Sequence, residues 1–181
     1  IGQIGSGGEG GAIGLNAAGG ESTLKVQNTI FDHNTFINAG YGTVFHGKSQ
    51  YFAEFDQCTC IVGAQTAGFG VFRFSSLPVL KNCIVVSEPN ASSTPIGMDA
   101  AIVSYSLVEG GYPGEGNIDA DPKFVDMENG DYHLQRGSPC VDSGTDTGVL
   151  TGFDGNPRPI GRYDMGAFEY PFLRSDINVD G

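Results

Sequence analysis

Carboxylates and basic groups on strand faces are the residues of this chain best suited to act on a substrate. Glu54 and Asp56 flank Phe55, and Arg73 lies between two phenylalanines in another apolar stretch. Successive side chains of a strand point to opposite faces, so all three are predicted to point outward. A polysaccharide lyase or hydrolase needs such groups on one surface to hold a sugar and move protons. Glu54, Asp56 and Arg73 are therefore the candidate catalytic residues; the alternative is a solvated outer face.

The histidines receive no catalytic assignment. His33 and His46 lie in or near predicted turns, and His133 lies in the predicted strand DYHL. A lone histidine is more often a surface or packing residue than a catalyst, and the chain has no G-x-S-x-G nucleophile motif.

Calcium is the one cofactor that the sequence suggests. Asp176, Asn178, Asp180 and Gly181 match positions 1, 3, 5 and 6 of a calcium loop, but the sequence ends before the carboxylate of position 12. We expect this partial loop to bind calcium only in a longer parent chain. A second acidic group comprises Asp119, Asp121, Asp126, Glu128 and Asp131. These carboxylates either bind calcium, or Asp121 forms a turn before Pro122 and the others are solvated on the surface of the C-terminal region.

The elements that would position these residues are short strands in a repeat. Val26, Phe55 and Leu80 occupy equivalent positions, 29 and 25 residues apart. A second pair of segments, GTVFH at 42–46 and GVFRF at 70–74, is aligned on its glycines with a spacing of 28 residues, and a further β stretch covers 101–108. Apolar residues alternate with period two, and short strands that recur every 20 to 30 residues predict an all-β solenoid.

Amide side chains recur two places after the apolar positions, at Asn28, Gln57 and Asn82. A buried amide is tolerated only when it is hydrogen-bonded, so we predict an inward amide ladder. The alternative is an exposed binding row.

Composition narrows the function classes. The chain has 181 residues, 29 glycines and 9 prolines, and a net charge of −12. Phosphate contacts require lysine and arginine, so nucleic acid is not expected as a partner. No apolar run is long enough to span a membrane. The four cysteines are expected to be buried small hydrophobes, although one disulfide is compatible with an oxidising compartment; they are Cys58, Cys60, Cys83 and Cys140.

Four phrases between Tyr105 and Tyr170 carry a family resemblance: YSLVEGG, GNIDADPKFVD, NGDYHLQRGSPCVDSG and FDGNPRPIGRYDMGAFEY. In this order they resemble the C-terminal end of secreted bacterial right-handed parallel β-helix proteins of the pectate-lyase-like type. The resemblance implies β-helix coils over 1–108, a cap over 109–172 that covers the last coil, and a linker with the start of a dockerin-like calcium loop over 173–181. Ion pairs among Asp154, Arg158, Arg162 and Asp164 are expected to pin the cap.

The function that these observations favour is a non-catalytic extracellular or cell-surface module, structural or adhesive, within a larger secreted bacterial protein. The alternative is the terminal part of a carbohydrate-active enzyme (a polysaccharide lyase or glycoside hydrolase) or a polysaccharide-binding β-helix. The expected partners are a polysaccharide, a neighbouring extracellular protein or a second copy of the chain. The chain opens with IGQIGSGGEGGAIG and without a signal peptide, so we expect it to be a piece of a longer protein.

Overall fold

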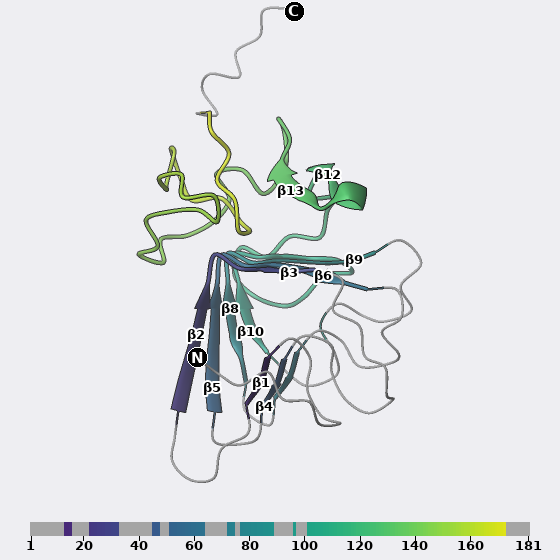
Figure 1. Ribbon diagram of the computed structural model, residues 1–181, viewed down its shortest axis with the longest axis vertical. Coiled ribbons are helices and arrows are strands. Elements are labelled where there is room, and N and C mark those ends of the chain that lie inside the picture. Colours follow the sequence, from purple (N-terminus) through teal and green to yellow (C-terminus); the bar gives the residue numbers. More distant parts are fainter. Residues whose placement is uncertain are drawn as a thin grey trace, which may run out of the picture.

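The computed structural model shows an all-β protein and describes residues 13–15, 22–32, 45–47, 51–63, 72–74, 77–88, 96 and 101–172 (Figure 1). The described residues contain no α-helix; one 3₁₀ turn, η1, spans Met127–Asn129. The predicted all-β class is therefore confirmed.

Strands from successive repeats pair in parallel and form three sheets, each named here after one of its strands. The β4 sheet contains β1 (Ile13–Leu15), β4 (Phe45–Gly47) and β7 (Phe72–Phe74). The β5 sheet contains β2 (Ser22–Gln27), β5 (Tyr51–Asp56), β8 (Val79–Lys81) and β10 (Ile102–Ser104). The β6 sheet contains β3 (Ile30–Phe31), β6 (Thr59–Val62), β9 (Ile84–Ser87) and β11 (Leu107–Val108). This arrangement is compatible with a β-helix.

The register confirms one predicted repeat and corrects the other. Val26 pairs with Phe55, Phe55 with Leu80, and Leu80 with Val103. The first three residues are the predicted inward row, and Val103 adds a fourth repeat to it. In the β4 sheet, however, Phe45 pairs with Phe72. The offset between the two strands is therefore 27 residues and not 28. In the sequence Gly42 precedes the first residue of β4 by one position more than Gly70 precedes the first residue of β7.

The predicted amide ladder is wrong. Asn28, Gln57 and Asn82 lie at the corners between the β5 and β6 sheets with positive φ angles of 45°, 54° and 51°. Asn82 exchanges two hydrogen bonds with the backbone of Thr145, at 2.6 and 2.8 Å, and Asn28 donates to the Thr151 carbonyl at 2.5 Å. The left-handed backbone at each corner turns these amides away from the interior, toward a later part of the chain. Gln57 is buried between them and its amide has no hydrogen-bond partner among the described residues.

The interior ladder occurs one residue later and is built from hydroxyls and thiols. Thr29, Cys58, Cys83 and Ser106 each donate to the carbonyl two residues earlier, at 2.8, 3.5, 3.3 and 2.9 Å respectively. All four cysteines of the chain are buried and free, which confirms their predicted packing role. Burial raises the pKa of the Cys83 thiol, which keeps it protonated and able to donate.

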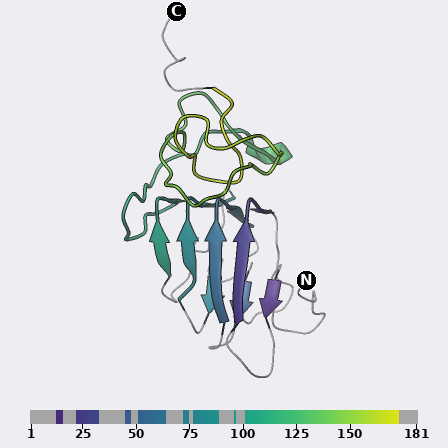
Figure 2. The same ribbon diagram turned by 90° about the vertical axis from the view of Figure 1, so that its left-hand side faces the viewer.

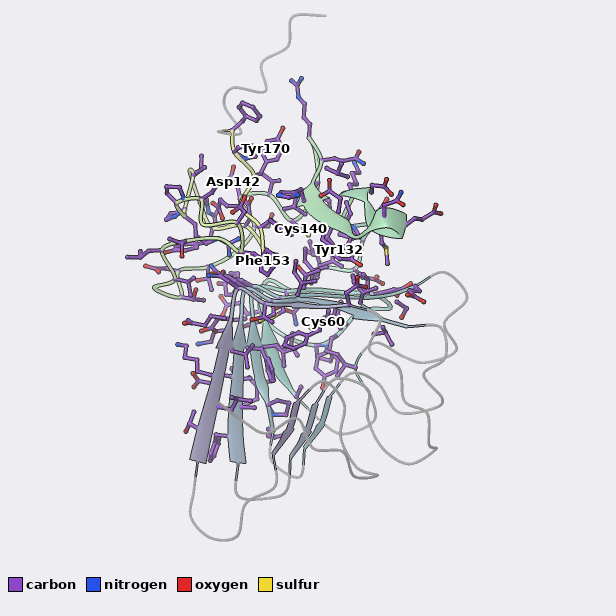
Figure 3. All side chains as sticks on the ribbon, viewed as in Figure 1. Cys60, Tyr132, Cys140, Asp142, Phe153 and Tyr170 are labelled. Atoms are coloured by element: carbon purple, nitrogen blue, oxygen red, sulfur yellow. The ribbon has the colours of Figure 1, made fainter. Side chains whose placement is uncertain are left out.

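The β6 sheet is buried on both faces. Cys60, Val62 and Val85 point inward and pack against the β5 sheet residues, whereas Ile61 and Ile84 point outward into a second apolar cluster. This second cluster is completed by residues 119–172, here called the flanking segment, which lies over the outer face of the β6 sheet (Figures 1 and 2). Figure 3 shows Cys60 and Tyr132 on opposite sides of this sheet.

A short part of the predicted cap, residues 109–118, bonds to the last coil. Tyr105 N–H donates to the Glu115 carbonyl at 2.7 Å. Ile118 N–H donates to the Ser106 carbonyl, and Val108 N–H donates to the Ile118 carbonyl, each at 3.0 Å. The flanking segment instead contacts the side of the sheet, where Ala167 N–H donates to the Thr59 hydroxyl at 3.0 Å. Gly166 has a φ of 92°, which L side chains rarely adopt, and a β-carbon there would also come within 2.6 Å of Ile84 Cδ1, so both the backbone and the close approach favour glycine.

The flanking segment begins with an antiparallel hairpin of β12 (Phe124–Asp126) and β13 (Asp131–Leu134). The predicted strand DYHL corresponds to β13. Asp126 caps η1 by accepting from Asn129 N–H at 3.2 Å, and Gly130 ends it in the left-handed conformation.

A buried ion pair organises the rest of the flanking segment. Arg158 Nε lies 3.0 Å from Glu169 Oε2, with both side chains fully buried, and the Arg158 guanidinium also donates to the Gly166 carbonyl at 3.1 and 3.2 Å. Glu169 Oε1 accepts from Ile160 N–H at 2.7 Å. The predicted set of ion-pairing residues therefore lacked the main partner, Glu169, while Arg162, which it included, is exposed.

Asp164 is buried beside this pair. Its two carboxylate oxygens accept from Asp142 N–H at 2.7 Å and from Tyr170 N–H at 2.6 Å. Burial, and secondarily the charge of Glu169, raise the pKa of Asp164 to about 7.

Arg158→Ala should destabilise the protein by about 3–5 kcal/mol, because it leaves the Glu169 carboxylate buried without its partner. Denaturant unfolding followed by circular dichroism measures the change. Arg162→Ala is the matched control, since an exposed arginine in the same segment should change stability by no more than about 0.5 kcal/mol. Equal effects of the two substitutions would contradict the structural role given to the ion pair.

The stability contributed by Asp164 should fall as pH rises from about 4 to about 7. An unfolded chain releases this proton near its ordinary pKa of about 3.9 and the folded chain near 7, so in this window the folded state binds more protons. The expected loss is as much as roughly 4 kcal/mol, measured as melting temperature against pH. Asp164→Asn should flatten the slope, whereas the exposed control Glu128→Gln should leave it unchanged; an unaltered slope in Asp164→Asn would refute the assignment.

Candidate functional site

The outer face of the β5 sheet, here called the β5 face, carries the predicted site residues Glu54 and Asp56. The register places two rows across its four strands. One row is Lys25, Glu54, Val79 and Ile102, and the other is Gln27, Asp56, Lys81 and Ser104. Figure 2 shows these strands side by side, with their outer face toward the viewer.

The polar part of the β5 face carries two carboxylates, Glu54 and Asp56, and two lysines, Lys25 and Lys81. Lys25 Nζ lies 3.1 Å from Asp56 Oδ2 and 3.9 Å from Glu54 Oε2. Gln27 Nε2 donates to the same Asp56 oxygen at 3.2 Å. Asp56 is buried by these neighbours, whereas Glu54 and Lys25 remain about half exposed and able to contact a ligand.

Arg73 is not part of the β5 face. It lies in β7 of the β4 sheet, paired with His46 of β4. The structure thus brings two of the three candidate catalytic residues together and places the third on another sheet. Lys25 and Lys81 supply basic groups on the β5 face, and Lys25 contacts both carboxylates. The repeat spacing that aligns Val26 with Phe55 also aligns Lys25 with Glu54, so the sequence contained the signal for it.

Apolar side chains are exposed beside the charged network. Phe52 is 55% exposed and Ile102 is 53% exposed, and Leu77 precedes β8 with 47% exposure. Phe52 comes two residues before Glu54 on the same strand, so the ring and the carboxylate share one face. A surface with an aromatic ring, an amide and charged groups can hold a ligand that has both apolar and hydroxyl-bearing faces.

A second polar constellation surrounds His133, which received no catalytic role from its sequence. Its Nδ1 lies 2.6 Å from Asp131 Oδ1, its Nε2 lies 3.8 Å from Asp154 Oδ2, and its ring stacks on Phe168 at 3.9 Å. The hydrogen bond from His133 lowers the pKa of Asp131. These contacts join β13 to the loop around Asp154. The Asp131–His133 spacing is visible in the sequence, but Asp154 is too distant along the chain to be linked to them.

The predicted partial calcium loop, Asp176, Asn178 and Asp180, lies outside the described residues. His33, which received no catalytic role, also lies outside them. Within the described ranges, no group of three or more histidine, cysteine or acidic side chains could hold a metal ion. The turn interpretation of Asp121 is confirmed, because its Oδ1 accepts from Lys123 N–H at 2.8 Å.

Comparison with protein-family models, with curated proteins and with solved structures finds no match for this chain. In the part of the chain that the structure describes, no helix has the length and apolar character to cross a membrane. The function is therefore argued from the geometry of the β5 face.

Proposed function

We propose that this chain is a right-handed parallel β-helix module of a larger secreted bacterial protein, where it has a structural or adhesive role outside the cell and no catalytic one. The observation that carries the proposal is the β5 face, on which exposed apolar side chains adjoin a charge-balanced polar network. Exposed apolar patches with a polar border are typical of binding surfaces. The family resemblance of residues 105–170 supports the secreted, extracellular setting.

A neutral polysaccharide is the ligand that this face fits best. The apolar C–H side of a sugar ring packs on an aromatic ring such as Phe52, while its hydroxyls exchange hydrogen bonds with Glu54, Gln27 and Lys25. Lys25 and Lys81 balance Glu54 and Asp56 on the face, while the whole chain carries a charge of −12. A polyanionic chain would be repelled by that net charge, so neutral polymers are favoured over acidic ones.

The alternative function is the terminal part of a polysaccharide lyase or glycoside hydrolase. It is favoured by one observation, the placement of Lys25 within 3.9 Å of both Glu54 and Asp56. Such a group combines carboxylates with a proton-carrying amine, as acid–base chemistry requires. For calcium, in either case, the proposed ligands are Asp176, Asn178 and Asp180, which have the spacing of a calcium loop.

The experiment is binding of the purified chain to soluble neutral polysaccharides and to polygalacturonate, by titration calorimetry, with calcium or with chelator. We expect saturable binding to at least one neutral polymer and a loss of affinity of about tenfold or more in Phe52→Ala, because one buried ring contributes about 1.5–3 kcal/mol. Phe153→Ala is the matched control, since Phe153 is 53% exposed but lies on the flanking segment. Both variants should keep the stability of the parent chain.

Three outcomes would overturn the proposal. Release of reducing ends or unsaturated products, abolished by Asp56→Asn, would make the chain an enzyme. Equal losses in Phe52→Ala and Phe153→Ala would remove the β5 face from the binding surface. Absence of polysaccharide binding together with concentration-dependent dimerisation through Phe52 would make a second copy of the chain the occupant of this face.

A further inference from the structure

A hollow separate from the β5 face opens between the last coil and the hairpin of β12 and β13. Its volume is about 600 Å³. Val86 at the end of β9, Phe124 and Met127 line it with apolar surface and belong to, or pack on, the core beneath the flanking segment. Glu109, Asp119 and Asp121 line it as well and are exposed. The hollow therefore has an apolar floor and a rim of three carboxylates.

Backbone N–H groups hold each of these carboxylates in place through one oxygen. Glu109 Oε2 accepts from Ser87 N–H at 2.7 Å, and Asp119 Oδ1 accepts from Gly110 N–H at 3.0 Å. Asp121 Oδ1 accepts from Lys123 N–H at 2.8 Å. The charges of the rim are thereby fixed in direction before any ligand arrives, which lowers the ordering cost of binding.

The lining has an excess of negative charge and an unsatisfied hydroxyl. Lys123 is the only cationic residue of the lining, and its ammonium donates to the Gly137 carbonyl at 3.2 Å. Ser87 also lines the hollow, and its hydroxyl oxygen is shielded from solvent without a hydrogen-bond partner among the described residues. A buried hydroxyl of this kind calls for a partner.

We propose that this hollow binds an organic cation with an aliphatic stem, an alkylguanidinium or alkylammonium group such as a basic side chain of a partner protein carries. The stem would lie on Val86, Phe124 and Met127, and the charged head would bond to the rim carboxylates, as lysine and arginine side chains do at protein surfaces. Inorganic calcium is the competing ligand. The described residues bring no three acidic, histidine or cysteine groups close enough around one metal ion, so the organic cation is the better fit.

The test is an amide-resolved NMR titration of the whole chain with n-butylguanidinium and n-butylammonium. The amides of Ser87, Gly110 and Lys123 bond directly to the rim carboxylates and report on them. Gly148 is the matched control amide, because it bonds to the exposed Asp146 carboxylate at 2.8 Å, outside the hollow. We expect saturable shifts at the three reporters, with a dissociation constant on the order of 1 mM, and none at Gly148.

Three comparisons decide the outcome, namely titration with n-butanol, titration with calcium, and titration of a doubly substituted chain. n-Butanol, with the same stem and no charge, should produce no saturable shift at the reporters. The double substitution Glu109→Gln and Asp119→Asn keeps the acceptor oxygens and removes two charges, and it should weaken binding at least about tenfold. The proposal is overturned by unsaturable shifts, by equal shifts at Gly148, by equal binding of butanol, or by saturation with calcium and not with the organic cations. The titration of the unsubstituted chain decides the matter even if the double variant fails to fold, and neither result depends on the β5 face.

Discussion

Burial of the β6 sheet on both faces is the constraint on which the other features of this protein depend. An apolar sheet face must be covered by another layer, and a sheet with two apolar faces needs two covers. The first cover is the interior shared with the β5 sheet, and the second is the flanking segment. Because the second cover has little regular secondary structure, its own backbone must be satisfied in other ways, which the Arg158–Glu169 pair and the bonds to Asp164 provide.

The corners of the repeat connect the two covers. At two corners, Asn28 and Asn82 have positive φ and bond through their side chains to the flanking segment, and the next residue directs a hydroxyl or thiol inward. Asn28 and Asn82 thus bond to Thr151 and Thr145, residues that come more than sixty positions later. The flanking segment therefore covers the outer face of the β6 sheet. The β5 face, in contrast, carries exposed side chains among the described residues, and the proposed binding function is assigned to it for this reason.

The sequence predicted the features that depend on local periodicity. The equivalence of Val26, Phe55 and Leu80 follows from spacing alone, and so does the shared face of Glu54 and Asp56. The sequence did not predict features that depend on backbone dihedrals, such as the direction of the Asn28 and Asn82 amides. It also did not predict contacts between residues distant in the chain, and it did not include Glu169 as the partner of Arg158. One signal was present but unused. The apolar runs CIV of β6 and IVV of β9 are typical of strands buried on both sides, whereas Glu54 and Asp56 alternate with Ala53 and Phe55 in β5.

Two outward-facing isoleucines offer the most direct test of this account. Ile84 on β9 lies beneath the flanking segment, and Ile102 on β10 is 53% exposed on the β5 face. The measurement is the unfolding free energy of Ile84→Glu and of Ile102→Glu. We predict that Ile84→Glu abolishes cooperative folding, because it buries an unpaired charge, and that Ile102→Glu changes stability by no more than about 0.5 kcal/mol. Equal stability of the two variants would contradict the double burial of the β6 sheet.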